Sequence, residues 1–266
     1  MTAPGTCWER PALNPDKIDI LLLGGTFEAR RLAAALNAQF PDLTIVASYA
    51  GSVQDLPDLP VPMRIGGFGG VDGLTSYLET HDVRLVIDST HPFASQMSHH
   101  AAAAAYLTSR PLIRLERPEW QPQEGDDWQN APDMQAALDG LHSGSRVFLA
   151  VGRKEIERFV HRQDVFALTR MIEPPAVPLP DHWHLELARP SQTVQDEIEL
   201  MQRHDISTLV CKNSGGTRSF AKLEAARALN LPVIMVQRPE LPKADTYGTT
   251  DLIVSETAHR LGRAPR

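Results

Sequence analysis

The chain has 266 residues, of which 42% are hydrophobic and 22% charged, as is typical of a globular protein with a sizeable core. Its formal net charge of −7 argues against general affinity for nucleic acid or for a membrane surface. No apolar run reaches the ~18 residues of a membrane span, the two cysteines give no disulfide framework, and no Cys/His spacing indicates a metal site. We therefore expect a cytoplasmic protein without a metal, in which residues 1–17, proline-bearing and aperiodic, form a flexible extension.

Strand-like and helix-like patterns alternate along the chain, which predicts an α/β fold with mainly parallel sheets. Strands are expected at residues 18–23, 43–50, 84–90, 111–118, 146–152, 165–172, 208–216 and 231–239. Helices are expected at residues 27–39, 71–82, 91–109, 134–141, 153–160, 191–205 and 218–230. The polar, proline-bearing stretch 117–132 has no periodicity and is typical of a linker. We therefore predict two Rossmann-like α/β domains, 18–120 and 121–266, with a ligand cleft between them.

The segment LLLGGTFEAR, residues 21–30, places a glycine turn between a strand and a helix, where a Rossmann fold binds pyrophosphate. Thr26 stands where the second glycine of that fingerprint would be, and its hydroxyl is a donor for a phosphate oxygen. The start of the following helix also favours an anion. A plain tight turn is the alternative. We take Gly24, Gly25, Thr26 and Glu28 as candidate cofactor contacts.

The next strand ends in VASYAGS, without the acid that NAD-preferring sites carry about 20 residues past the first glycine. The hydroxyl of Ser48 tolerates a 2′-phosphate, so NADP is favoured over NAD if the turn binds a dinucleotide. The alternative is that Ser48 merely ends a strand.

Glycines surround one aromatic residue in RIGGFGG, residues 64–70. Such density is expected where a backbone approaches a ligand closely. Phe68 would then lie against a flat ring, or it would anchor the loop in the core. The glycines favour the ligand, and we take Gly67, Phe68 and Gly69 as candidate cofactor contacts.

The segment DSTHPFA, residues 88–94, ends a strand and is expected to open a helix, with Pro92 in its first turn. There His91 and Thr90 would position a nicotinamide carboxamide, a substrate carboxylate or a proton. Equally, Thr90 caps the helix and His91 is a surface residue.

Basic and small polar residues follow two strands of the second half, in VGRKEIERF and CKNSGGTRSFAK. Such strand ends hold carboxylates or phosphates. The candidate anion-binding residues are Arg153, Lys154, Lys212, Asn213, Ser214, Gly215 and Gly216. Lys222, further along its helix, is interpreted as surface charge.

In their order and spacing, these segments resemble the precorrin-6A reductase family of cobalamin biosynthesis. The likeness runs from about Ile20 to about Pro239 and rests on LLLGGTFEAR, SYAG, RIGGFGG, VIDSTHPFA, FLAVGR, KNSGGTRSFAKLEAA and LPVIMVQRP. It implies a cytoplasmic, NADPH-dependent reductase that saturates one double bond of the precorrin-6A macrocycle to give precorrin-6B. Some relatives take the cobalt-containing precorrin. It also implies transient contacts with other enzymes of the pathway.

The resemblance explains cations inside an acidic protein, because the macrocycle carries many carboxylates; Arg64 joins the candidate substrate contacts on this ground. His91 and Lys212 are the candidate proton donors, with bound water as the alternative. Many members of the family carry an Arg where this chain has Ser52, and either Arg30 or Arg64 would compensate for it at a 2′-phosphate.

Two other functions compete with this interpretation. A short-chain reductase or epimerase would need a Tyr-x-x-x-Lys pair, and none of the four tyrosines is followed by Lys at that interval. A non-catalytic, two-lobed ligand-binding module would explain a cleft but not a phosphate turn and a basic cluster in separate halves.

Overall fold

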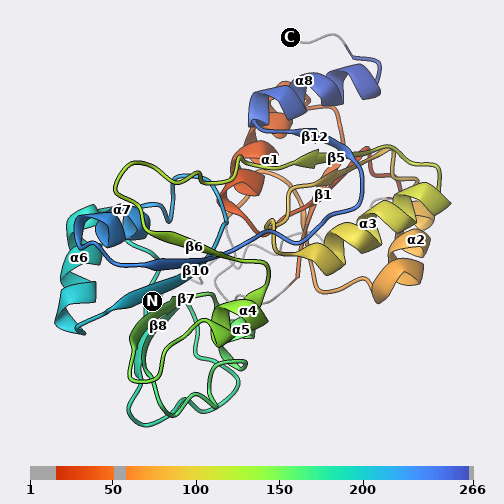
Figure 1. Ribbon diagram of the computed structural model, residues 1–266. Coiled ribbons are helices and arrows are strands. Elements are labelled where there is room, and N and C mark those ends of the chain that lie inside the picture. Colours follow the sequence, from red (N-terminus) through yellow and green to blue (C-terminus); the bar gives the residue numbers. More distant parts are fainter. Residues whose placement is uncertain (1–15, 51–57, 264–266) are drawn as a thin grey trace, which may run out of the picture. The chain divides into compact units, whose positions relative to one another are not determined.

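The computed structural model describes residues 16–50 and 58–263, which divide into two α/β units (Figure 1). The first unit combines Met1–Glu116 with Pro242–Arg266, and the second is Arg117–Leu241. Each unit has one six-stranded sheet, and every strand pair that the described residues form is parallel. The prediction of two α/β domains with parallel sheets is therefore confirmed.

The sheet of the first unit has the strand order β12-β5-β4-β1-β2-β3. Its strands are β1 (Ile20–Leu23), β2 (Ile45–Tyr49), β3 (Met63–Ile65), β4 (Leu85–Asp88), β5 (Leu112–Leu115) and β12 (Asp245–Tyr247). Its helices are α1 (Phe27–Gln39), α2 (Gly70–Thr80), α3 (Ser95–Leu107) and α8 (Thr250–Arg260). Strand β2 lies on one side of β1 and β4 on the other, so the direction in which successive strands are added to the sheet reverses at β1. Open α/β sheets bind ligands beyond the carboxyl ends of the strands at such a reversal.

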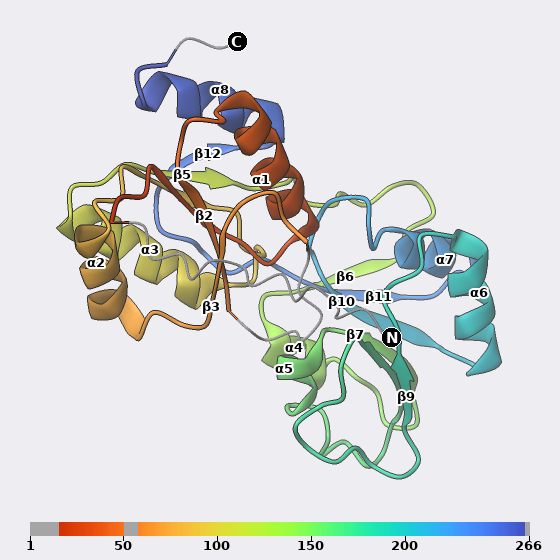
Figure 2. The ribbon, with the colours of Figure 1, turned by 180° about the vertical axis from the view of Figure 1, so that it is seen from behind.

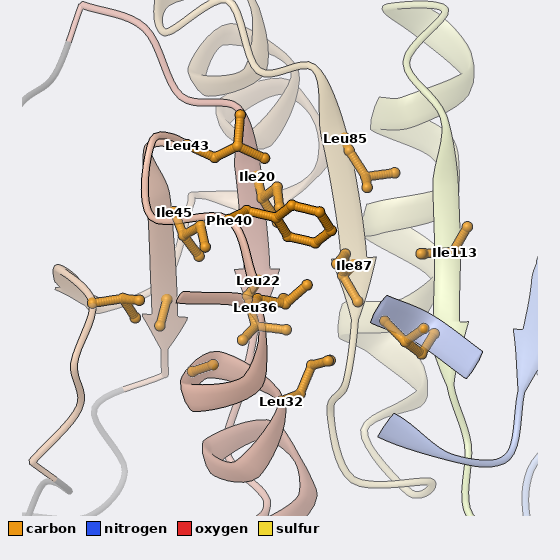
Figure 3. Packing of buried hydrophobic residues seen from close by; sticks show 14 of the residues in the cluster. Ile20, Leu22, Leu32, Leu36, Phe40, Leu43, Ile45, Leu85, Ile87 and Ile113 are labelled. Carbon is orange, nitrogen blue, oxygen red and sulfur yellow. The ribbon is translucent and has the colours of Figure 1, made fainter. Parts of the chain in front are cut away.

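Helices cover both faces of this sheet, which is why β1 is an unbroken apolar run. On one face, Ile20 and Leu22 of β1 pack beneath Leu32 and Leu36 of α1, with α8 beside them (Figure 3). On the other face, the alternate residues of β1 pack against α2 and α3. Full burial of each such leucine or isoleucine stabilises the fold by about 1.5–3 kcal/mol.

The second unit has the order β6-β11-β10-β7-β8-β9, in which five strands follow the same order as in the first sheet, but the edge strand β6 comes first in its unit whereas β12 comes last. Its strands are β6 (Trp128–Ala131), β7 (Arg146–Ala150), β8 (Phe166–Met171), β9 (His184–Leu187), β10 (Thr208–Lys212) and β11 (Val233–Val236). Its helices are α4 (Met134–Asp139), α5 (Arg153–Ile156), α6 (Val194–Arg203) and α7 (Ala221–Ala228). Helices α6 and α7 lie side by side on this sheet (Figure 2). In this sheet the strand order reverses between β7 and β10, and these are the two strands that the basic segments follow.

The observed bounds differ from the expected domains of residues 18–120 and 121–266. Residues 242–266 belong to the first unit, because β12 pairs with β5 and α8 packs on α1. The stretch 117–132 is not a linker, because β6 pairs with β11 and Trp120 is buried in the second core. Of the expected extension 1–17, residues 1–15 lie outside the described residues.

No helix within residues 16–50 and 58–263 combines the length and the apolar character that crossing a bilayer requires.

Candidate functional site

Two glycines form the turn after β1, each for its own reason. A Cβ atom on Gly24 would lie 2.9 Å from Cε2 of Tyr49, so the buried tyrosine ring leaves no room for a side chain. Gly25 has a φ of +127°, which L side chains rarely adopt. Gly25 is exposed, and among residues 16–50 and 58–263 nothing apart from its chain neighbours lies within 4 Å of the position that its Cβ would occupy, so this backbone is open to a ligand on that side.

Thr26 has a structural role that its position in the turn did not reveal. Its hydroxyl donates to the carbonyl of Ser89 at 3.0 Å and accepts the N–H of Ala29 at 3.0 Å, which caps α1. The single hydroxyl proton is therefore used inside the protein. Thr26 thus ties the turn after β1 to the turn after β4, and a contact between Thr26 and a cofactor phosphate stays a prediction.

Glu28 lies in the first turn of α1, where an acid complements the positive end of the helix dipole. This role needs no cofactor, and a contact between Glu28 and a cofactor stays a prediction.

The loop that follows β3 is organised by Arg64. Its guanidinium donates to the carbonyl oxygens of Gly66 at 2.6 Å and Gly67 at 2.7 Å, and lies 3.8 Å from the centre of the Phe68 ring. The ring of Phe68 also contacts Tyr77, with ring centroids 5.2 Å apart. Burial lowers the pKa of Arg64. These contacts favour the anchor role for Phe68 and give Arg64 a role within its own loop.

Ser48 and Gly69 have simpler surroundings. Ser48 is buried near the end of β2, and its hydroxyl lies 3.4 Å from Nη1 of Arg64. Gly69, with a φ of +86°, is the residue before α2 and is exposed. Their contacts with a cofactor, like those of Gly67, stay predictions.

A buried carboxylate, which is not among the residues expected from the sequence, lies at the end of β4. Asp88 accepts hydrogen bonds from the N–H and hydroxyl of Thr90 (3.1 and 2.7 Å), the hydroxyl of Ser98 (2.6 Å) and Nε of Arg114 (3.2 Å). Arg114 also donates to the carbonyl of Pro242 at 3.0 Å. The sequence does contain a sign of this buried pair, because one charged residue lies in each of two otherwise apolar strand segments, VID and LIRL. Asp88 thus fixes the segment that leads to His91.

His91 lies in a turn and not at the start of a helix. The N–H of Ala94 donates to the carbonyl of His91 at 2.7 Å, with Pro92 in the second position that type I turns favour. Helix α3 begins only at Ser95, and the hydroxyl of Thr90 bonds to Asp88, so the expected helix start and cap are wrong. The N–H of Phe93 donates to Nδ1 of His91 at 3.2 Å, which leaves the proton of the neutral ring on Nε2. Catalysis by His91 stays a prediction.

In the second unit, two of the candidate cations form ion pairs with carboxylates. Nζ of Lys212, at the end of β10, lies 3.0 Å from Glu155, and Nη1 of Arg153 lies 3.1 Å from Glu173. Lys154 is exposed. Helix α5 ends at Ile156, so it is shorter than the expected 153–160. A bound carboxylate would share these cations with the carboxylates already present.

The loop of residues 213–219, which we call the NSGG loop, packs against the segment that was expected to be a linker. The amide of Asn213 accepts the N–H of Trp120 at 2.9 Å and donates to its carbonyl at 3.1 Å. The side-chain amide of Asn213 thus has a structural role, and a contact between Asn213 and a substrate stays a prediction. Gly215 is in close contact too, since its Cβ would lie 2.2 Å from the carbonyl oxygen of Pro118. Contacts of Ser214, Gly215 and Gly216 with a substrate stay predictions.

Lys222 is a buried residue and not surface charge. It is 4% exposed, its ammonium donates to the carbonyl of Ser219, and its Nζ lies 4.6 Å from the centre of the Trp120 ring. Burial lowers the pKa of Lys222. The residue lies on the first turn of α7, where the pattern of alanines gave no sign of a buried charge.

Within residues 16–50 and 58–263, no group of three or more His, Cys, Asp or Glu side chains is placed to hold a metal ion.

Known proteins resemble this chain over nearly its whole length. The family model described as "Precorrin-6x reductase CbiJ/CobK" matches residues 19–257. The precorrin-6A reductase of Rhodococcus erythropolis is 50% identical over 227 residues, which cover 85% of this chain and 91% of the relative. That of Rhodobacter capsulatus is 43% identical over 250 residues, covering 93% and 98%. A solved structure of CobK precorrin-6A reductase matches with a TM-score of 0.85 and 43% identity, covering 94% of this chain and 99% of the other.

Proposed function

Because the chain belongs to the family of precorrin-6x reductases CbiJ/CobK, we propose that it reduces one double bond of precorrin-6A with NADPH to give precorrin-6B. The chain is an oxidoreductase of cobalamin biosynthesis that acts on a tetrapyrrole-derived macrocycle. The structural observation that carries the proposal is the glycine turn after β1, which lies at the reversal of the first sheet and is accessible at Gly25.

This turn fits the pyrophosphate of a dinucleotide. The backbone at Gly25 is open, and α1 begins directly after Thr26, so its first amides favour an anion. The cofactor, when bound, supplies the hydride. The first unit binds and orients it, with Gly24 and Gly25 permitting close approach and Thr26 holding the turn.

Arg30 is the residue that we propose for recognition of the 2′-phosphate. Arg64 is engaged by its own loop, and Ser52 lies outside the described residues. Arg30 is half-buried on α1 and lies 5.7 Å from the centre of the Phe27 ring. It is close enough to Tyr49, the last residue of β2, for its charge to oppose the rise in pKa that burial gives this phenol. The end of β2 is where Rossmann folds bind the adenosine ribose.

A nucleotide titration tests this assignment. Arg30→Gln should weaken NADPH binding by about tenfold or more, because it removes a hydrogen bond between charged groups, and should leave NADH binding unchanged. The neighbouring and exposed Arg31 gives the matched control, Arg31→Gln. Equal losses in both variants, or a parallel loss of NADH binding, would place the phosphate elsewhere.

The second unit is proposed to bind the carboxylates of the macrocycle, with Lys212 as its central cation. Saturation of a double bond needs a proton as well as a hydride, and we propose Nε2 of His91 and Nζ of Lys212 as donors to test beside bound water. Lys212→Ala should raise KM for precorrin-6A or lower kcat while NADPH affinity stays nearly unchanged. Equal loss of NADPH binding would sink the assignment of Lys212 to the substrate.

An anaerobic assay with precorrin-6A and NADPH tests the function itself. Oxidation of NADPH should accompany a mass gain of two hydrogen atoms in the macrocycle, and cobalt-precorrin-6A in parallel shows which form is preferred. Binding of NADPH and macrocycle without turnover would favour the non-catalytic module. We further propose that the enzyme works in the cytoplasm, in transient contact with other enzymes of the pathway.

A further inference from the structure

The NSGG loop has its carbonyl groups held by side chains of the second unit. Four carbonyl oxygens accept hydrogen bonds from one indole and three cationic residues. The bonds run from Arg238 Nε to Asn213 (2.9 Å), from Arg117 Nε and Arg238 Nη2 to Ser214 (2.6 and 3.3 Å), from Trp120 Nε1 to Gly216 (2.7 Å) and from Lys222 Nζ to Ser219. These four carbonyl oxygens of the loop therefore face donors of the second unit.

The orientation of these carbonyls fixes the direction of the amides that follow them. In a planar trans peptide the C=O of one residue and the N–H of the next point in opposite directions. Because the carbonyls of Ser214 and Gly216 point to Arg117 and Trp120, the N–H groups of Gly215 and Thr217 point away from those side chains. Thr217 is exposed whereas Gly215 is buried, so of these two amides it is that of Thr217 that belongs to an exposed residue. A backbone N–H that faces away from the protein donates readily to an anion.

Lys222 is the least expected member of this arrangement. A buried ammonium costs folding free energy, and a methionine of similar length would avoid that cost. Lys222 is nevertheless retained beneath the loop, between the carbonyl of Ser219 and the ring of Trp120. Trp120 in turn is fixed by its two backbone bonds to Asn213. A positive charge on the inner side of the loop adds to the attraction of the Thr217 amide for a carboxylate.

We propose that Lys222 and Trp120 are positioning residues for substrate binding, which hold the NSGG loop with the amide of Thr217 directed at a carboxylate of the macrocycle. This inference rests on the proposed function. It assigns the binding of an acidic group to a backbone amide of the loop and gives the side chain of Asn213 a supporting role.

Two conservative variants test the proposal, each measured for KM and kcat with precorrin-6A and for NADPH affinity. Lys222→Met removes the charge and keeps the apolar stem, and should raise KM for precorrin-6A by about tenfold or more. Trp120→Phe keeps a ring beside Lys222 but removes the donor to Gly216, and should raise KM by a smaller factor. Neither change should alter NADPH affinity, and kcat should change less than KM in both.

The matched control is Trp183→Phe. Trp183 is also buried in the second unit, and its Nε1 donates to the carbonyl of Val165 at 3.0 Å. This variant should lose stability much as Trp120→Phe does, yet keep KM for precorrin-6A. An unchanged KM in folded Lys222→Met, or the same rise in KM for both tryptophan variants, would overturn the proposal. If Lys222→Met does not fold, the comparison of the two tryptophan variants decides it.

The wild type separates this proposal from the proposed function. Turnover of precorrin-6A by the wild type with unaltered KM in the variants would refute only the role of Lys222 and Trp120. Failure of the wild type to reduce the macrocycle would refute the function on which that role depends.

Discussion

The substitution Asp88→Asn tests whether a buried ion pair holds the turn after β4 in the first unit. Its side chain is 2% exposed and that of its partner Arg114 is 6% exposed, so Asp88→Asn leaves a cation buried without its counter-charge. Removal of one partner from a buried ion pair costs about 3–5 kcal/mol. The asparagine keeps one oxygen that can accept a hydrogen bond, for example from Thr90. We therefore expect a loss near the lower end, about 3 kcal/mol in the free energy of unfolding.

Urea denaturation followed by far-UV circular dichroism measures this loss, and hydrogen exchange locates it. Faster exchange should appear in peptides that contain β4 and β5, because Asp88 and Arg114 join these strands. The variant should also bind NADPH more weakly, since Asp88 holds the backbone and hydroxyl of Thr90 in front of His91.

A double-mutant cycle checks the physical reason. Arg114→Met removes the buried cation, so Asp88→Asn with Arg114→Met should be less destabilised than the sum of the single changes by about 1–3 kcal/mol. Additive losses, or a loss below about 1 kcal/mol for Asp88→Asn alone, would refute the assignment of this pair as a buried, coupled network.

Three further predictions concern the glycine turn and the second core. Thr26→Val should cost about 1–2 kcal/mol of stability in urea denaturation, because the cap of α1 and the bond to Ser89 are both lost, whereas Thr26→Ser should cost much less; equal stabilities would contradict this role. Gly24→Ala should cost about 1–3 kcal/mol because its Cβ would meet the Tyr49 ring, and Tyr49→Leu in the same chain should recover part of that loss, which thermal denaturation would reveal. Burial raises the pKa of Cys211 from 9.0 to about 11, so the unfolded thiol ionises first as pH rises. The free energy of unfolding should therefore fall by up to about 3 kcal/mol between pH 9 and 11 in the wild type relative to Cys211→Ala, and parallel pH profiles would argue against a buried thiol.

The sequence predicts the central strands of both sheets and misses all four edge strands. Strands such as β1 and β10 have neighbours on both sides and helices on both faces, so they appear as apolar runs. The missed strands β3, β6, β9 and β12 lie at the sheet edges and have three or four residues each. A short strand with one neighbour and little buried surface carries no hydrophobic pattern. This is why Asp245–Tyr247, and with it the C-terminal segment, was assigned to the wrong unit.

The turns that form the candidate site follow the expected strands, but the partners of their side chains were not predictable. The hydroxyl of Thr26 bonds to Ser89, 63 residues away, and the amide of Asn213 bonds to Trp120, 93 residues away. A local pattern indicates that a polar side chain ends a strand, and it does not indicate which distant backbone group uses that side chain. Lys222 illustrates the same limit, because its burial depends on Trp120, which lies in a stretch without periodicity.

In both units, charged side chains hold the turns at the strand ends. The first unit uses a carboxylate and the second uses cations, and this difference affects which ligands the turns can bind. In the first unit, the carboxylate of Asp88 takes up an amide and two hydroxyl protons, so these donors are used internally. In the second unit, cations and an indole donate to carbonyl oxygens, so the amide of the exposed Thr217, which follows the Gly216 carbonyl, faces away from Trp120. A loop with such an amide and cations behind it suits a polycarboxylate better than a loop whose donors serve a buried acid. The proposed binding of the macrocycle by the second unit follows from this difference as well as from Lys212.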